Sequence, residues 1–126
     1  MPSAQPETTT QILVVEDDEG LRFAMDWMLS DSGYAVLSAG NGAEALDVIS
    51  STLPRLILLD MRMPIMDGWE FARAYRSQPG PHAPIVVVTA AADARERANQ
   101  INANGFLAKP FDVEDLIRVV QRHIVP

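Results

Sequence analysis

The amino-acid sequence predicts an α/β fold, a doubly wound sheet of five parallel strands with five helices. Short apolar runs rich in β-branched residues alternate with stretches of helical period, which is typical of a parallel sheet covered by helices. Three of the runs are apolar throughout, which indicates central strands that are covered on both faces. The length of 126 residues suits one domain with one core.

The five predicted strands correspond to the apolar runs. They comprise residues 12–15, 34–37, 56–59, 85–88 and 106–108. The first, third and fourth runs are the continuously apolar ones, so we expect them at the centre of the sheet. The second and fifth are weaker and suit its edges.

Five helices are predicted between and after the strands from residues that recur at helical spacing. Their apolar faces are, in chain order, Leu21, Met25, Met28 and Leu29; Ala43, Leu46 and Ile49; Phe71 and Ala74; Ala94, Ala98 and Ile101; Val113, Leu116, Ile117, Val120 and Ile124. Asn41 and Glu44 resemble a capping box for the second helix, the third begins near Gly68, and Asp112 caps the last. The fourth helix is the most polar.

Domain organisation follows from composition. We expect residues 1–10 to form a disordered tail and residues 11–126 to form a single domain. The tail is neither basic nor apolar enough for a signal peptide, and no apolar run approaches the roughly 20 residues of a membrane helix.

The chain has no cysteine, which suits a reducing compartment, so we expect a cytoplasmic protein. A formal charge of -7 without a cluster of Lys and Arg argues against direct binding to nucleic acid.

Polar side chains follow the strands at their carboxyl ends, where doubly wound sheets carry their functional residues. Residues 16–18, Glu-Asp-Asp, follow the first strand, and Asp60 follows the third. Thr89 follows the fourth strand and Lys109 the fifth. In a parallel sheet these groups converge on one edge.

The acids at this edge imply a bound cation. Two carboxylates at 4 Å repel each other by about 4 kcal/mol at an effective dielectric near 20. Mg²⁺ fits best, because it prefers hard oxygen ligands and binds through one or two carboxylates plus a phosphate. Ca²⁺ is the weaker alternative, since the sequence offers few protein oxygens and no EF-hand loop.

Asp60 is the candidate nucleophile of the set. A carboxylate beside bound Mg²⁺ can attack a phosphoryl group and form an aspartyl phosphate. Such a transfer requires positioning and cancellation of charge on the equatorial oxygens. The Lys109 ammonium and the Thr89 hydroxyl supply suitable partners for those oxygens.

From residue 11 to residue 125 the sequence resembles the receiver domains of two-component response regulators. The motifs that carry the resemblance are residues 12–18 (ILVVEDD), 58–68 (LLDMRMPIMDG), 88–90 (VTA) and 105–111 (GFLAKPF). Their joint occurrence, in order and at strand ends, is highly specific. The resemblance implies a flavodoxin-like strand order of 2-1-3-4-5, and it is greatest to single-domain, stand-alone regulators of the chemotaxis type.

The resemblance also implies roles for individual residues. Asp60 would be the phosphorylated aspartate, and Glu16 and Asp17, rather than Asp17 and Asp18, would be the acid pair that holds Mg²⁺. The backbone carbonyl of Arg62 would be a further metal ligand. Lys109 and Thr89 would contact the phosphoryl group.

The same resemblance implies a switch and its partners. Thr89 and Phe106 would couple phosphorylation to the face made by the fourth helix, fifth strand and fifth helix, where a downstream protein would bind. The phosphodonor would be a histidine kinase or a histidine phosphotransfer protein. We expect a monomer or weak dimer that catalyses only its own phosphorylation and dephosphorylation.

The chief alternative is a phosphatase or phosphomutase with an aspartyl nucleophile on a related fold. Such enzymes carry a second acid two residues after the nucleophile, and this position is Arg62 here. A flavin or dinucleotide carrier is disfavoured, because acids follow the first strand where a glycine-rich phosphate loop is needed. Whether the chain is a stand-alone protein or part of a longer regulator is left open by the sequence.

Overall fold

The computed structural model describes residues 11–126, so the predicted disordered tail lies outside the described residues. One sheet contains five parallel strands in the order β2-β1-β3-β4-β5, which confirms the predicted fold class. The strands are β1 (Ile12–Val15), β2 (Val36–Ala39), β3 (Leu56–Leu59), β4 (Ile85–Ala90) and β5 (Gly105–Lys109).

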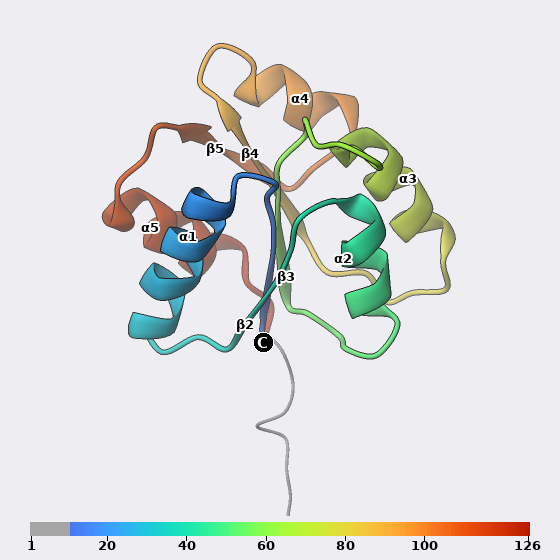
Figure 1. The fold of residues 1–126 in the computed structure, drawn as a ribbon, viewed down its shortest axis with the longest axis horizontal. Helices are drawn as coiled ribbons and strands as arrows, with labels where there is room; N and C mark the ends of the chain where they lie inside the picture. Colours follow the sequence, from blue (N-terminus) through green and yellow to red (C-terminus); the bar gives the residue numbers. More distant parts are fainter. Residues whose placement is uncertain (1–10) are drawn as a thin grey trace, which may run out of the picture.

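Helices cover both faces of the sheet (Figure 1). They are α1 (Glu19–Asp31), α2 (Gly42–Ile49), α3 (Gly68–Ser77), α4 (Ala94–Gln100) and α5 (Val113–His123). Buried side chains of α1 and α5 share one apolar cluster with the strands, and those of α2, α3 and α4 share the other. The fold therefore has three layers.

The central strands supply both clusters because successive side chains of a strand point to opposite faces. Along β1, Ile12 and Val14 face α1 and α5, whereas Leu13 and Val15 face α2 and α3. All residues of β1 and β3 are buried. This explains why their sequences are apolar without alternation.

The second strand and second helix differ in detail from the sequence prediction. β2 spans Val36–Ala39, two residues later than predicted, because Ile12 of β1 pairs in register with Val36. In α2 the fully buried residue is Ala45, whereas Ala43 is only partly buried. β2 is a partly exposed edge strand, so its apolar residues do not show clearly where the strand begins and ends.

Helix N-termini are capped by side chains at four of the five helices of the described region. Asn41 accepts a hydrogen bond from the Glu44 N–H, as predicted, but the Glu44 carboxylate accepts from the N–H of Gly40. Capping boxes open α3 at Asp67 and α5 at Asp112. The exception is α4, where Asp93 makes no side-chain capping bond.

Candidate functional site

The carboxyl ends of β1 and β3 place two acids side by side. Val15 and Leu59 are register partners, so the next residues, Glu16 and Asp60, leave adjacent strands at the same level. The Asp60 N–H donates to the Val15 carbonyl at 2.9 Å, which extends the strand pairing by one bond. Both side chains are buried, with 2% and 6% of their surface exposed.

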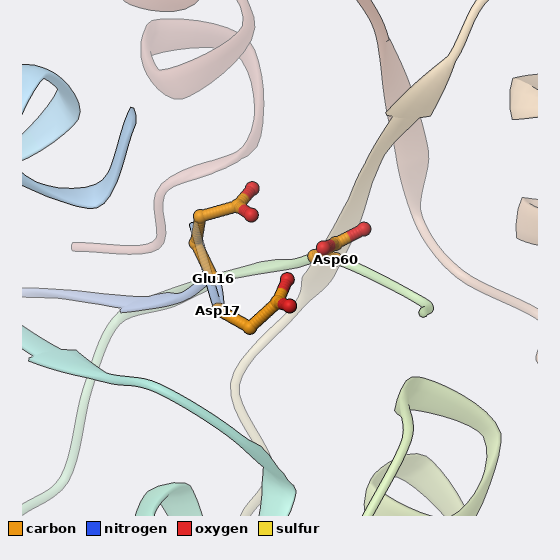
Figure 2. Close-up of side chains that lie close together, drawn as sticks. All are labelled: Glu16, Asp17 and Asp60. Atoms are coloured by element: carbon orange, nitrogen blue, oxygen red, sulfur yellow. The ribbon is translucent and has the colours of Figure 1, made fainter. Parts of the chain in front are cut away.

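Asp17 completes a cluster of three carboxylates with Glu16 and Asp60 (Figure 2). One oxygen from each lies within 4.8 Å of the others, and Asp17 is the exposed member. Glu16 Oε1 is buried without a hydrogen-bond partner among the described residues. Three carboxylates this close together form an all-oxygen donor set with excess negative charge, which suits a small, hard divalent cation, so these residues fit Mg²⁺.

Lys109, at the end of β5, brings a positive charge to the cluster. Its Nζ lies 2.8 Å from Glu16 Oε1 and 3.8 Å from Asp60 Oδ2. The first contact is an ion pair whose angles are not those of a hydrogen bond. Lys109 is also the only lysine in the chain, and the Lys109–Pro110 peptide bond is cis.

Burial and charge shift the acid equilibrium of Asp60. Burial and, next in size, the charge of the Glu16 carboxylate together raise the pKa of Asp60 to about 7, against the opposing effect of Lys109. One ammonium therefore does not offset the burial of the carboxylate. A further cation at the cluster would favour the ionised, nucleophilic form of Asp60.

Asp18 lies outside the cluster because it caps α1. Its carboxylate accepts a hydrogen bond from the Leu21 N–H at 2.9 Å, and its own N–H donates to Glu16 Oε2 at 3.1 Å. Asp18 thus fixes the start of α1 and orients Glu16. Of the three consecutive acids, the structure brings Glu16 and Asp17 to Asp60, and their role as the acid pair for a metal stays a prediction.

An open hollow of about 360 Å³ lies beside the cluster. Its lining residues are Asp17, Arg62, Met63, Pro64, Asp67 and Trp69. Arg62 occupies the position two residues after Asp60, where a phosphatase of the alternative class would carry its acid. Asp17, the exposed acid of the cluster, lies on the wall of this hollow.

Thr89 and Phe106 lie on the neighbouring strands β4 and β5. Thr89 is buried at 7% exposure, and Phe106 is exposed at 37%. The register pairs Phe106 with Val87 and Thr89 with Ala108, so the two candidate switch residues are two positions apart along the sheet. The Arg95 guanidinium of α4 lies over the Phe106 ring, 5.3 Å from its centroid.

Two interactions near the site have no counterpart in the sequence prediction. Arg22 of α1 donates to the Glu16 carbonyl at 2.7 Å. Trp69, on the wall of the hollow, donates through Nε1 to Gln100 of α4 at 2.8 Å. Their partners are a backbone atom and a residue 31 positions away, which no local sequence pattern identifies.

Comparison with known proteins decides the family. The family model of the response regulator receiver domain matches residues 12–121. The chain belongs to this family. Accordingly it is a receiver domain of two-component response regulators, a class that takes phosphate from histidine kinases and regulates downstream effectors. The phosphatase alternative is not favoured.

Among curated relatives, the response regulator MprA of Mycobacterium bovis is 41% identical over 111 residues, covering 86% of this chain and 48% of the relative. The MprA protein of Mycolicibacterium vanbaalenii is 40% identical over 121 residues, with 92% and 52% covered. The receiver domain therefore spans about half the length of the curated relatives that it matches.

Solved structures give the same architecture. The chemotaxis protein CheY4 of Vibrio cholerae is similar with a TM-score of 0.83 and 32% identity, over 93% of this chain and 100% of that one. The receiver domain of sensor histidine kinase PA1611 from Pseudomonas aeruginosa has a TM-score of 0.82 and 35% identity, over 92% and 98% of the two chains. That structure contains a magnesium ion coordinated in its active site cleft.

Among the helices of residues 11–126, none combines the length and apolar character needed to cross a bilayer.

Proposed function

We propose that Asp60 is the phosphoacceptor of this receiver domain and takes a phosphoryl group from the phosphohistidine of a histidine kinase or histidine phosphotransfer protein. The observation that carries the proposal is the position of Asp60 at the end of a buried strand. There, its carboxylate lies beside two further acids and 3.8 Å from the Lys109 ammonium. Such a site concentrates the charges that phosphoryl transfer requires.

Mg²⁺ would be held by the carboxylates of Glu16, Asp17 and Asp60 and by the backbone carbonyl of Arg62. The donor set is all oxygen and includes Glu16 Oε1, which is buried and accepts no hydrogen bond from the described residues. The magnesium ion in the similar Pseudomonas aeruginosa receiver supports this assignment. When bound, Mg²⁺ supplies the positive charge that offsets the carboxylates and one phosphoryl oxygen.

The transfer forms a bond between an Asp60 carboxylate oxygen and phosphorus while the phosphorus–nitrogen bond of the donor breaks. The donor imidazole leaves neutral when its other nitrogen carries a proton. Lys109 and Thr89 would each hold one equatorial oxygen of the phosphoryl group. Asp60 must be ionised to attack, and its raised pKa of about 7 makes this depend on the positive charge nearby.

Hydrolysis would end the signal. Attack of water on phosphorus breaks its bond to the Asp60 oxygen and returns the carboxylate and inorganic phosphate. Arg62 provides no general acid for a foreign leaving group. The domain would therefore catalyse only its own phosphorylation and dephosphorylation.

The output surface is the face of α4, β5 and α5, with Thr89 and Phe106 as the coupling pair. Thr89 would turn toward the phosphoryl group, and the Phe106 ring, now partly exposed under Arg95, would turn into the space behind it. A downstream protein would bind this face. A cytoplasmic monomer or weak dimer suits this role.

The test is incubation with Mg²⁺ and acetyl phosphate, followed by mass spectrometry of the intact protein. We expect one acid-labile phosphoryl group on the natural sequence and none on Asp60→Asn. Asp18→Asn is the matched control, because it alters a neighbouring carboxylate that caps α1. An unlabelled natural protein, or equal labelling of Asp60→Asn, contradicts the proposal.

The coupling through Phe106 has its own test. Phosphorylation should shift the NMR signals of amides in α4 and β5, and Phe106→Ala should reduce these shifts while leaving labelling of Asp60 intact. Phe111→Ala serves as an aromatic control on the other apolar cluster. If the shifts in α4 keep their full size in Phe106→Ala, the ring is not the coupling element.

A further inference from the structure

Arg22 is a half-buried arginine on the second turn of α1, beside the acid cluster. Its Nη1 donates to the backbone carbonyl of Glu16 at 2.7 Å. This carbonyl belongs to the peptide that joins Glu16 to Asp17, the two acids assigned to Mg²⁺. The guanidinium therefore contacts the main chain between two proposed ligands.

The Glu16–Asp17 segment is fixed from two further directions. The Glu16 N–H donates to the Ala39 carbonyl of β2 at 3.0 Å, and Asp18 is bound into the first turn of α1. Arg22 adds the bond on the carbonyl side, which determines the orientation of the peptide plane. Rotation of this plane would turn the Asp17 side chain away from Asp60, because the rest of the segment is held.

Gly40, between β2 and α2, leaves room for the guanidinium. A Cβ atom at Gly40 would lie 3.4 Å from Arg22 Nη1 and 3.3 Å from Glu44 Oε1. The Glu44 carboxylate in turn accepts the Gly40 N–H at 2.7 Å. An alanine Cβ at Gly40 would therefore touch Arg22 Nη1 at an ordinary contact distance and press slightly on the flexible end of Glu44, whereas a larger side chain would compete for the space beside the guanidinium.

We infer that Arg22 is a positioning residue for the metal centre, acting through the Glu16 carbonyl to hold Asp17 in the cluster. The inference rests on the proposed function, since it assumes that Glu16 and Asp17 bind Mg²⁺. Arg22 places no guanidinium nitrogen within 4.0 Å of a carboxylate of the described residues, so its action is through the backbone. In other proteins, loss of a group that orients a metal ligand in this way typically weakens metal binding by about 10- to 100-fold.

The sign of the effect separates this inference from simple electrostatics. A permanent cation near a cation site repels Mg²⁺, so charge alone predicts that removal of Arg22 tightens Mg²⁺ binding. Positioning predicts the opposite, a weaker site. Arginine, methionine and lysine have similar helix propensities, so Arg22→Met and Arg22→Lys leave α1 intact.

The experiment is a titration of the full chain with MgCl₂, in which the amide signals of Asp17 and Asp60 are followed by NMR. We expect Arg22→Met to raise the Kd for Mg²⁺ by about 10-fold or more. Arg22→Lys, which can restore one donor to the carbonyl, should bind within a few-fold of the natural sequence. Arg118→Met on the exposed surface of α5 controls for the loss of one charge.

Gly40→Val is a second variant that keeps the charge of Arg22 but places methyl groups beyond the Cβ position that already touches its guanidinium. Gly40 has no positive φ, so valine fits its backbone, and we expect a several-fold weaker site. If Arg22→Met does not fold, this second variant tests the positioning role of Arg22 instead. A Kd that is unchanged or lowered in every folded variant overturns the inference, whereas no Mg²⁺ binding by the natural sequence would overturn the proposed function first.

A purely structural role for Arg22 is distinguished by thermal unfolding without Mg²⁺. If Arg22→Met lowers the Tm of the metal-free protein but leaves the Kd of the folded protein unchanged, the residue only stabilises the fold. A raised Kd with a rescue by lysine supports positioning.

Discussion

Glu16 and Asp60 expose 2% and 6% of their surface, whereas Phe106 exposes 37%. The two acids follow fully buried strands and are tied to the main chain of β1, β2 and α1. The α4–β5 region is held unevenly. The acid cluster therefore lies at a firmly held edge of the sheet, whereas the proposed output residue Phe106 lies in a more exposed region.

Helix α4 is bonded to α3 at its C-terminal end and lacks a side-chain cap at its N-terminal end. Trp69 binds Gln100, and Arg76 donates to the Ile101 and Asn102 carbonyls. At the other end Ala94 is buried, but Asp93 makes no capping bond through its side chain. The uncapped end of α4 is the one that follows Thr89 in the chain, so it is the end nearer in sequence to the proposed phosphoryl site.

The largest expected effect of a substitution falls on the firmly held edge, at Gly68. A Cβ atom there would lie 2.7 Å from Met61 Cα and 2.8 Å from the Asp60 carbonyl oxygen. These are backbone atoms that cannot rotate away, so we expect Gly68→Ala to lower the free energy of unfolding by about 3 kcal/mol or more. Urea unfolding measures this loss of free energy. Gly20→Ala, where the nearest atom is 3.5 Å away, should show no loss.

The second prediction concerns the cost of the buried charge at Asp60. Its pKa rises from 3.8 in the unfolded chain to about 7 in the metal-free fold, so the fold holds this proton more tightly than the unfolded chain does and loses stability as the pH rises from about 4 to about 7. Asp60→Asn should therefore raise the free energy of unfolding at pH 8 by about 1 kcal/mol or more, and by much less at pH 4. Thermal unfolding in EDTA at the two pH values measures this difference. An equal gain in the free energy of unfolding at pH 4 and pH 8 would show that the charge of Asp60 is not the cause.

The third prediction compares two helix caps. Asp67 forms a capping box with Glu70, whereas Asp93 forms no capping bond. Asp67→Ala should cost about 1 kcal/mol and Asp93→Ala less than about 0.5 kcal/mol. Equal losses in chemical denaturation would mean that α4 is held at its N-terminal end as firmly as α3.

The smallest effect is expected at the contact between Arg95 and Phe106. An exposed cation–π contact contributes about 0.5 kcal/mol. A double-mutant cycle with Arg95→Met and Phe106→Leu should give a coupling energy of that size in the unphosphorylated protein. A coupling energy of zero would remove Arg95 from the interactions that favour the exposed position of the ring.

The sequence predicted most of the fold, because the central strands and the helices carry strong periodic patterns. The limits of β1 and β3 were predicted correctly, and those of β2 were wrong by two residues. The edge position of β2 explains this error, since pairing with β1, rather than its own composition, sets its register. Prediction was strongest where burial is complete.

The sequence predicted which acidic and basic residues come together at the candidate site, but it did not predict the hydrogen bonds that hold them in place. Glu16, Asp17, Asp60 and Lys109 follow strands whose ends must meet, so their proximity follows from the parallel sheet. Arg22 binds a backbone carbonyl, and because every residue has such a carbonyl, the sequence does not reveal this bond. Roles of the site residues in metal binding and phosphoryl transfer stay predictions until the experiments above are done.

The strand order also bears on how copies of this chain avoid association. The segments 12–15, 56–59 and 85–88 are uncharged and apolar, a composition that favours stacking between chains. All three form inner strands, and the edges of the sheet are β2 and β5, short strands of four and five residues that include Ser38 and Lys109. Short edges with polar or charged side chains resist pairing with a second sheet. Pairing of these three segments between chains therefore requires the sheet to open first, because each is flanked on both sides by a strand of its own sheet.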